Sequence, residues 1–202
     1  MRSAPLDRFY PIWDSTRWMR RLLPLGVKLV QLRIKDLEAD ALRAEIRLAR
    51  DLCREHGATL IVNDFWQIAI EEECEFIHLG QEDLDDADLP AIRRAGLRLG
   101  VSTHDHTELD RALSVDPDYI ALGPVWPTIL KKMKWIEQGL DRVTEWKRLV
   151  GKVPLCAIGG MTPDRARMAL AAGADLCSVV TDITLNDNPE DRTREWIAAT
   201  RH

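Results

Sequence analysis

The sequence predicts a single-domain (β/α)8 TIM barrel of the α/β class, at the compact end of that architecture's size range. Short apolar runs alternate with longer amphipathic runs about eight times along 202 residues. Strands that are separated by helices pair in parallel, and no linker rich in Pro, Gly or Ser divides the chain. We therefore expect one domain over residues 1–202. A doubly wound open sheet is the alternative, although its G-x-G-x-x-G fingerprint is absent from the sequence.

The predicted strands are the short apolar runs. The clearest is LVQLRIKD at residues 29–36, in which Gln31, Arg33 and Lys35 alternate with apolar side chains. Such alternation is typical of a strand, because its successive side chains point to opposite faces. In chain order, the expected strands cover residues 9–14, 29–35, 59–64, 76–80, 98–102, 118–124, 154–160 and 175–181.

Between these runs the apolar residues recur with helical spacing. Residues 39–56 show it most clearly, with Leu42, Ile46 and Ala49 on one face. Thr162 before Pro163 is typical of a capped helix start. Glycines at positions 26, 57, 96 and 173 each follow a helical stretch, where a left-handed residue is favoured. The expected helices cover residues 39–56, 85–95, 107–113, 140–150, 163–172 and 189–200.

Composition excludes several functions. The net charge of −5 opposes a general nucleic-acid or anionic-membrane surface, so any basic cluster must be a local site. No signal peptide or transmembrane run is recognisable, which predicts a cytoplasmic location. The cysteines are scattered without metal-ligand spacing and are expected to be reduced and structural: Cys53, Cys74, Cys156 and Cys177. Whether the chain forms a homo-oligomer is left open.

In a barrel, alternate strand residues point inward and active sites lie at the carboxyl ends of the strands. Gln31, Arg33 and Lys35 would then rise toward that mouth. Burying two cations is costly without anionic partners. Two interpretations remain open at this point, namely a structural network of ion pairs and a site for a polyanionic ligand.

Polar residues also follow the other predicted strands. Asp64 and Asp83 are hard oxygen donors of the kind that Mg²⁺ takes together with substrate phosphates and water. Arg33 can bind phosphate in a bidentate manner, while lysines at 35 and 131 act as point charges. The glycine pair 159–160 permits backbone N–H groups to approach an anion. Together these residues favour a metal and phosphate site at one rim.

Seven short segments follow one another along the chain: QLRIKD, VND, HLGQEDL, GVSTH, DYIALGPVWPT, AIGG and VVTDI. In this order they resemble the motifs of the thiamine phosphate synthase family, and the resemblance covers nearly the whole chain. The family joins hydroxymethylpyrimidine diphosphate to hydroxyethylthiazole phosphate, which gives thiamine phosphate and pyrophosphate. The resemblance therefore implies a transferase with these two small-molecule substrates and Mg²⁺ as its cofactor.

The resemblance also implies roles for particular residues. The pyrimidine diphosphate would be held by Gln31, Arg33, Lys35, Asn63 and Lys131, with Ser102 near its leaving group. Asp64 and Asp83 would bind Mg²⁺. The thiazole phosphate would be held by Thr128, Gly160, Val180 and Thr181. Arg33, Lys35, Ser102 and Lys131 would act in catalysis by stabilising the charge that develops on the leaving diphosphate.

Two positions depart from the family pattern. The usual Thr-x-Thr-Lys after the sixth strand places Leu130 where the second threonine is expected, and the usual Ser-Ala-Ile has Asp182 in place of alanine. The segment KKMKW at 131–135 is either a solvated basic loop or a flap with Trp135 over the diphosphate. His104 is expected to form hydrogen bonds rather than to catalyse.

Two other functions compete with the synthase. One is a thiazole tautomerase-like isomerase on the same scaffold, which does not need the metal carboxylates. The joint presence of four residues argues against it, namely Asp64, Asp83, Arg33 and Lys35. The other is a non-catalytic barrel that binds thiamine precursors, for which Leu130 leaves room. An assay of pyrophosphate release distinguishes all three.

Overall fold

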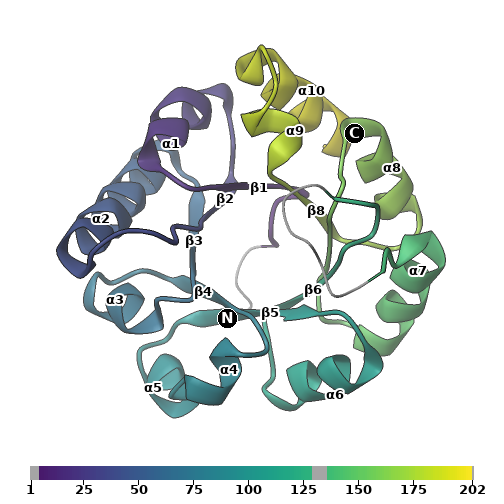
Figure 1. Cartoon of the computed structure of the whole chain (residues 1–202), viewed down its shortest axis with the longest axis horizontal. Coiled ribbons are helices and arrows are strands. Elements are labelled where there is room, and N and C mark those ends of the chain that lie inside the picture. The colour runs from purple at the N-terminus through teal and green to yellow at the C-terminus, as the bar shows by residue number, and fades with distance from the viewer. Residues whose placement is uncertain (1–4, 129–135, 202) are drawn as a thin grey trace.

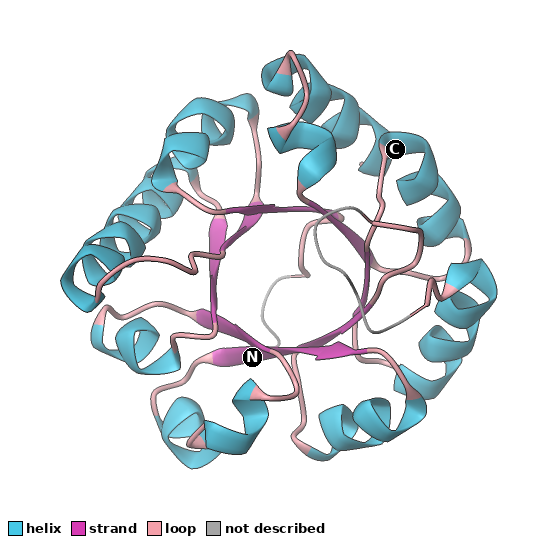
Figure 2. Ribbon diagram, in the orientation of Figure 1, coloured by secondary structure: helices cyan, strands magenta, loops and turns pink. Residues whose placement is uncertain are grey.

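The structure is a computed structural model that describes residues 5–128 and 136–201. Eight parallel strands follow one another in sequence order and close into a barrel, because β1 pairs with both β2 and β8 (Figure 1). Helices form a ring around this barrel (Figure 2). The predicted fold class is therefore confirmed, and the open doubly wound sheet is wrong.

The strands are short, and each is five residues or so in length. They are β1 (Phe9–Trp13), β2 (Leu29–Leu32), β3 (Thr59–Asn63), β4 (Phe76–Leu79), β5 (Arg98–Thr103), β6 (Tyr119–Leu122), β7 (Leu155–Ile158) and β8 (Leu176–Val179). All eight predicted strands are present. The second differs most from its expected bounds, because β2 ends at Leu32, and Arg33 and Lys35 lie in the segment beyond it.

The helical elements cover the outside of the barrel. They are α1 (Thr16–Leu22), the 3-10 helix η1 (Leu23–Leu25), α2 (Ala39–His56), α3 (Trp66–Glu71), α4 (Asp83–Asp86), α5 (Leu89–Arg94), α6 (His106–Ser114), α7 (Gly139–Val150), α8 (Pro163–Ala171), α9 (Thr181–Thr184) and α10 (Pro189–Thr200).

Short helices account for most errors of the sequence prediction. Helices α1, α3 and α9 were not predicted, since four to seven residues give too few turns for a readable apolar period. The helix expected at 85–95 is two helices, because Ala87 takes an extended conformation and Asp88 caps α5 from outside. The predicted turn glycines at 26, 57, 96 and 173 all have positive φ.

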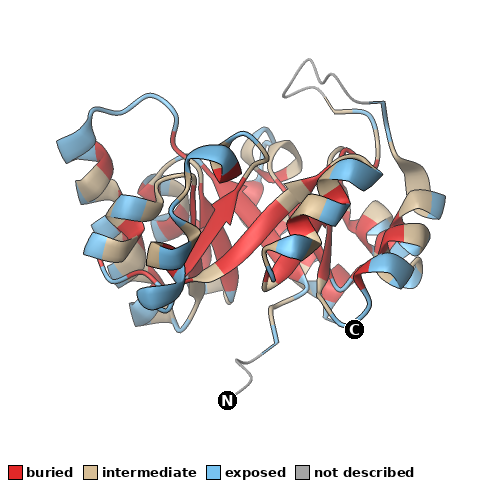
Figure 3. Cartoon of the chain, turned by 90° about the horizontal axis from the view of Figure 1, so that it is seen from below, coloured by how far each residue is buried: buried red, intermediate tan, exposed pale blue. Residues whose placement is uncertain are grey.

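Two apolar layers result from the alternation of the strand side chains. On β2, Val30 and Leu32 point outward into the large core between the barrel and the helices, whereas Leu29 belongs to the smaller cluster inside the barrel. Tyr10, Phe76 and Tyr119 occupy that inner cluster. Buried residues follow the strands and the inner faces of the helices (Figure 3). Burial of these faces is the dominant stabilising contribution.

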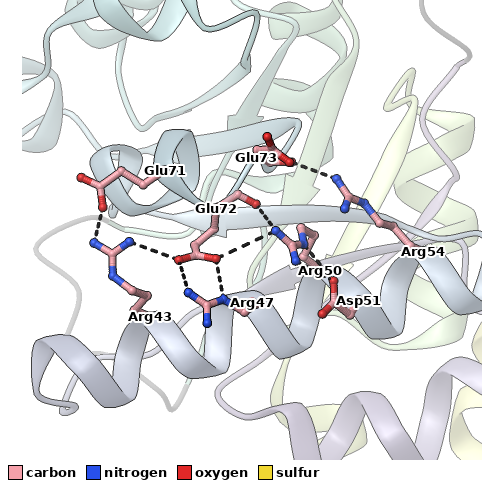
Figure 4. Close-up of polar contacts among 8 residues, drawn as sticks. All are labelled: Arg43, Arg47, Arg50, Asp51, Arg54, Glu71, Glu72 and Glu73. Carbon is pink, nitrogen blue, oxygen red and sulfur yellow. Dashed lines mark hydrogen bonds and ion pairs between the residues drawn. The ribbon is translucent and has the colours of Figure 1, made fainter.

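A cluster that we call the arginine clasp joins α2 to the end of α3. It consists of Arg43, Arg47, Arg50 and Arg54 on one face of α2, with Glu72 at its centre and Glu71, Glu73 and Asp51 at its edges (Figure 4). Arg47 Nε lies 2.8 Å from Glu72 Oε2, and Arg43 Nη1 lies 3.1 Å from Glu72 Oε1. Arg50 and Arg54 donate to the carbonyl oxygens of Glu72 and Glu73. The arginine clasp therefore supplies hydrogen-bond donors to the buried carboxylate of Glu72 and to backbone carbonyl groups at the end of α3.

Candidate active site

The carboxyl ends of the strands surround a cavity of about 480 Å³. Six of the predicted site residues line it: Gln31, Arg33, Asn63, Asp64, Asp83 and Ser102. They come from β2, β3, β5 and the starts of the segments that follow β2, β3 and β4. Residues distant in the sequence are thus brought together at the rim where barrel enzymes hold their substrates.

Asp64 and Asp83 are neighbours at this mouth. The pKa of Asp64 is raised to about 6, mainly by burial and also by the negative charge of Asp83 and a hydrogen bond with it, while the charge of Arg33 opposes the shift. A carboxyl group whose pKa is raised by burial and by a second carboxylate lacks a full positive counter-charge within the protein. Two adjacent acids of this kind suit a hard divalent cation, which takes oxygen ligands.

The backbone sets the position of both acids. Asp64 directly follows β3 with φ of 66°, a left-handed conformation that Asp tolerates better than most residues, and its N–H donates to the His78 carbonyl over 3.0 Å. Gly80 N–H donates to Asp83 Oδ2 over 3.1 Å. A Cβ at Gly80 would lie 2.9 Å from that oxygen, so a larger residue would displace the carboxylate.

The polar residues of the predicted ladder have different surroundings. Gln31 is 2% exposed and lies inside the barrel, Arg33 is half-buried at the mouth, and Lys35 is exposed. The strand ends before Arg33, so the inward alternation does not extend to Lys35. Arg33 lines the same cavity as the acid pair, and its positive charge lowers the pKa of Asp64. A contact of Lys35 with a diphosphate stays a prediction.

The residues predicted to hold the second phosphate lie outside the residues that line this cavity. Gly160 has φ of 58°, and a Cβ there would meet Pro127 O at 2.3 Å, so only glycine fits beside the segment after β6. Val180 and Thr181 begin α9, and Thr128 ends the described part of the segment after β6. Lys131, Leu130 and Trp135 lie outside the described residues.

The side chain of Asp182 is held by residues of another helix. Its two carboxylate oxygens accept hydrogen bonds from Arg192 Nε at 2.7 Å and Nη2 at 2.9 Å, and Trp196 Nε1 donates to it at 2.7 Å. Both partners lie on α10. The departure from the family pattern therefore adds an ion pair between α9 and α10, which accounts for the acid.

Several residues of the mouth were not predicted from the sequence. Gln81 is one of them, and its Nε2 donates to the Ser102 carbonyl at 2.7 Å. His104 forms a hydrogen bond, as expected, with Nδ1 2.7 Å from Glu108 Oε2. Three buried ring side chains also line the cavity, namely Tyr10, His78 and Tyr119. His78 has the inward register of Phe76 two residues earlier, so strand alternation alone could have found it.

Among residues 5–128 and 136–201, no group of three or more His, Cys, Asp or Glu side chains is placed to hold a metal ion. Asp64 and Asp83 are the residues that could hold Mg²⁺, which commonly uses one or two carboxylates and completes its shell with phosphate and water. The cysteines are buried and free, as predicted. No helix within the described ranges has the length and apolar character needed to cross a membrane.

These features define a barrel enzyme whose site combines an acid pair with a cation at the mouth. A family model described as "Thiamine monophosphate synthase" matches residues 10–183. The chain is similar to the thiamine-phosphate synthase of Rhizobium etli, with 62% identity over 96% of both chains. It is also similar to the thiamine-phosphate synthase of an Enterobacter species, with 45% identity over 95% of this chain and 87% of the other.

Solved structures agree. A thiamine phosphate pyrophosphorylase from Pyrococcus furiosus superposes with a TM-score of 0.85 at 26% identity, covering 96% of this chain and 95% of that one. The chain therefore belongs to the thiamine monophosphate synthase family. It is a transferase of thiamine biosynthesis, as the resemblance implied.

Proposed function

We propose that this family member joins hydroxymethylpyrimidine diphosphate to hydroxyethylthiazole phosphate in a reaction assisted by Mg²⁺. The observation that carries the proposal is the pairing of two uncompensated acids, Asp64 and Asp83, with Arg33 at one rim. An acid pair and a cation at one place suit a diphosphate that is bound through a divalent cation, because each charge then has an opposite partner.

The proposed reaction is dissociative. The bond between the pyrimidine methylene carbon and the diphosphate oxygen breaks, and the electron pair leaves with pyrophosphate. The thiazole nitrogen then donates its lone pair to the methylene cation, so that no general base is needed. Mg²⁺ bound by Asp64 and Asp83 would supply charge stabilisation for the leaving group.

Residues of the chain contribute to the same charge stabilisation. Arg33 lies in the mouth cavity beside Asp64, where its guanidinium can donate two hydrogen bonds to phosphate oxygens. Ser102 lines the same cavity and can donate its hydroxyl proton to the diphosphate. Lys35 and Lys131 would add point charges from the segments after β2 and β6. Gln31 and Asn63 would orient the pyrimidine.

The thiazole phosphate is proposed to bind beside β7 and β8. Gly160, Val180 and Thr181 offer backbone N–H groups and a hydroxyl there, and Thr128 follows from the neighbouring segment. The ion pair of Asp182 with Arg192 leaves this position without an exposed negative charge. We propose the cytoplasm as the location of the enzyme and leave its oligomeric state open.

A coupled assay of pyrophosphate release tests the proposal. Purified protein is given both substrates, with and without Mg²⁺, and thiamine phosphate is identified by mass. We expect release that requires both substrates and the metal. Conversion of the thiazole alone without Mg²⁺ would identify the tautomerase-like isomerase, and binding of either substrate without turnover would identify a non-catalytic barrel.

A further inference from the structure

A continuous chain of hydrogen bonds crosses the inside of the barrel below the mouth. Gln31 Nε2 lies 2.6 Å from Tyr10 Oη, which lies 2.8 Å from Tyr119 Oη. Tyr119 Oη lies 2.6 Å from His78 Nδ1, and His78 Nε2 lies 2.8 Å from Ser102 Oγ. The chain therefore connects β2, β1, β6, β4 and β5 and ends at a residue that lines the cavity.

The surrounding packing holds these groups in place. Tyr10 and Tyr119 are at most 1% exposed, and the ring of His78 stacks on Tyr119 with centroids 5.5 Å apart. A Cβ at Gly100 would lie 2.1 Å from the Tyr119 ring, so glycine at this point of β5 makes room for the ring. Phe76 also packs against Tyr119, so the Tyr119 ring has close neighbours on several sides.

One end of this series of hydrogen bonds has a fixed direction. An amide N–H only donates, so Tyr10 Oη accepts from Gln31. Either tyrosine can donate in the bond between the two rings, and the arrangement that continues from Gln31 has Tyr10 donate to Tyr119. Tyr119 in turn gives its proton to His78 Nδ1. A ring whose Nδ1 accepts this hydrogen bond has no proton on that nitrogen and is therefore neutral. A neutral ring that accepts at Nδ1 carries its proton on Nε2.

This tautomer determines what Ser102 can do. His78 Nε2–H donates to Ser102 Oγ, so the oxygen is an acceptor in that bond. Among the described residues, His78 Nε2 is the side-chain partner of Ser102 Oγ, so in this arrangement the hydroxyl proton of Ser102 is not donated to it. Because Ser102 lines the cavity, a hydroxyl proton that is not donated to His78 can point to a bound ligand.

We propose that His78 is a positioning residue, held by Tyr119 in the Nε2–H form, which keeps Ser102 oriented as a hydrogen-bond donor to the departing diphosphate. No proton is transferred along the chain; the hydrogen bonds only fix directions. The part that concerns the diphosphate rests on the proposed function. The tautomer of His78 does not, and it is measured without any substrate.

The first experiment measures that tautomer. ¹⁵N-histidine-labelled protein is observed by NMR between pH 5 and 8, and the His78 signal is assigned by its disappearance in His78→Gln. We expect a neutral ring protonated at Nε2 over this range. In Tyr119→Phe, which removes the donor to Nδ1, we expect a share of Nδ1–H to appear. A ring protonated at Nδ1 in the wild type would overturn the proposal.

The second experiment uses a matched pair of variants. An Asn amide lies near the position of Nδ1 and cannot reach Ser102, whereas a Gln amide N–H lies near that of Nε2. His78→Asn should lower kcat about as much as Ser102→Ala does, on the order of 10²-fold, as for loss of one donor to a developing negative charge. His78→Gln should retain most of the activity. KM should change little in all three variants, since the interaction matters when charge develops.

A double-mutant cycle separates positioning from general damage. In Ser102→Ala, the further change His78→Asn should cost almost nothing, because the two residues act through one hydrogen bond. Losses that multiply, or equal losses in the Asn and Gln variants, would overturn the proposal. Thermal unfolding confirms that each variant is folded. If the wild type released no pyrophosphate at all, the proposed function would fail while the NMR result still decided the tautomer.

Discussion

At the barrel mouth, Asp64 and Asp83 face each other with Arg33 as a partial counter-charge, whereas in the arginine clasp the single carboxylate of Glu72 is enclosed by arginines (Figure 4). The pKa values move in opposite directions. Burial raises that of Asp64 to about 6, while hydrogen bonds from Arg47 lower that of Glu72 to about 2. Both acids sit beside the same short helix, since α3 begins shortly after Asp64 and ends at Glu71.

The difference separates a structural acid from one that is available to a ligand. Glu72 has its hydrogen bonds satisfied by the protein and stabilises the fold. Asp64 and Asp83 repel each other in the protein alone, so a cation from solution would relieve that repulsion. Repulsion between two acids at the mouth therefore indicates a binding site, whereas the paired charges of the arginine clasp indicate a structural role.

The largest effect is expected at the mouth. Asp83→Asn keeps the shape and the bond from Gly80 N–H but removes one charge of the pair. The kcat/KM for pyrophosphate release should fall by about 10²-fold or more, because the charge stabilisation of the leaving group is lost. Steady-state kinetics with varied Mg²⁺ measure it.

The matched control is Asp86→Asn, which changes an exposed acid on the same helix, α4. Its activity should equal that of the wild type. Equal losses in the two variants would mean that the acid pair has no special role, and a large fall in the stability of Asp83→Asn would assign Asp83 to the fold.

The clasp should show the reverse pattern. Glu72→Gln removes the charge of the buried carboxylate that accepts hydrogen bonds from Arg43 and Arg47, so the free energy of unfolding should fall by about 1–3 kcal/mol. Activity should be unchanged at a temperature where the variant is folded. Urea denaturation measures the stability.

Glu71→Gln is the control for this change, because the Glu71 side chain is 52% exposed although it also pairs with Arg43. An exposed pair contributes about 0–1 kcal/mol. If Glu71→Gln and Glu72→Gln cost the same, burial of the central carboxylate would not be what makes the clasp stabilising.

The pH dependence of stability should have opposite signs in the two regions. Glu72 has its pKa lowered from 4.5 to about 2, so its contribution is present above pH 4.5 and is lost as the pH falls through about 2. Asp64 has its pKa raised from 3.8 to about 6, so without metal its contribution is full below pH 3.8 and is lost as the pH rises through about 6.

Denaturation from pH 2 to 7 in metal-free buffer, on wild type and on the two single variants, measures both contributions. The stability difference between wild type and Glu72→Gln should grow from pH 2 to 4.5. In Asp83→Asn, the loss between pH 3.8 and 6 should shrink, because Asp83 no longer opposes ionisation of Asp64. If the stability difference from the wild type changed with pH in the same way for Glu72→Gln and for Asp83→Asn, the comparison of the two regions would be refuted.

The smallest effect is expected at Asp182. Its charge is held by Arg192 and Trp196, so Asp182→Asn should leave the KM for the thiazole phosphate unchanged within about twofold. Stability should fall by about 1 kcal/mol with the weakened bonds. Asp187→Asn, on the exposed turn before α10, serves as the control. A tenfold lower KM in Asp182→Asn would show that the acid does reach the phosphate.

The sequence was sufficient to predict the closed barrel, because eight alternating runs leave few other arrangements. The grouping of Asp64, Asp83, Arg33 and Ser102 at one rim was predicted for the same reason, since each follows or ends a strand. The exposure of Lys35 was missed, because alternation in the sequence continues past Leu32 although the strand does not.

Contacts between side chains that are distant in the sequence could not be predicted from it. The hydrogen bonds inside the barrel connect Tyr10 to His78 through Tyr119, and these residues are far apart in sequence and belong to different strands. The arginines of the clasp recur along one face of α2, but nothing in that spacing shows that Glu72 turns toward them. The partner of Asp182 lies ten residues later on another helix.

The central claim is that Asp64 and Asp83 create a site for a metal-bound diphosphate. Isothermal titration calorimetry with inorganic pyrophosphate, at several Mg²⁺ concentrations, tests it without either organic substrate. We expect wild type and Glu72→Gln to bind pyrophosphate alike and only with Mg²⁺, and Asp83→Asn to bind at least about tenfold more weakly, a loss of 1.4 kcal/mol. Binding by Asp83→Asn equal to that of the wild type, or binding that is indifferent to Mg²⁺, would contradict the account.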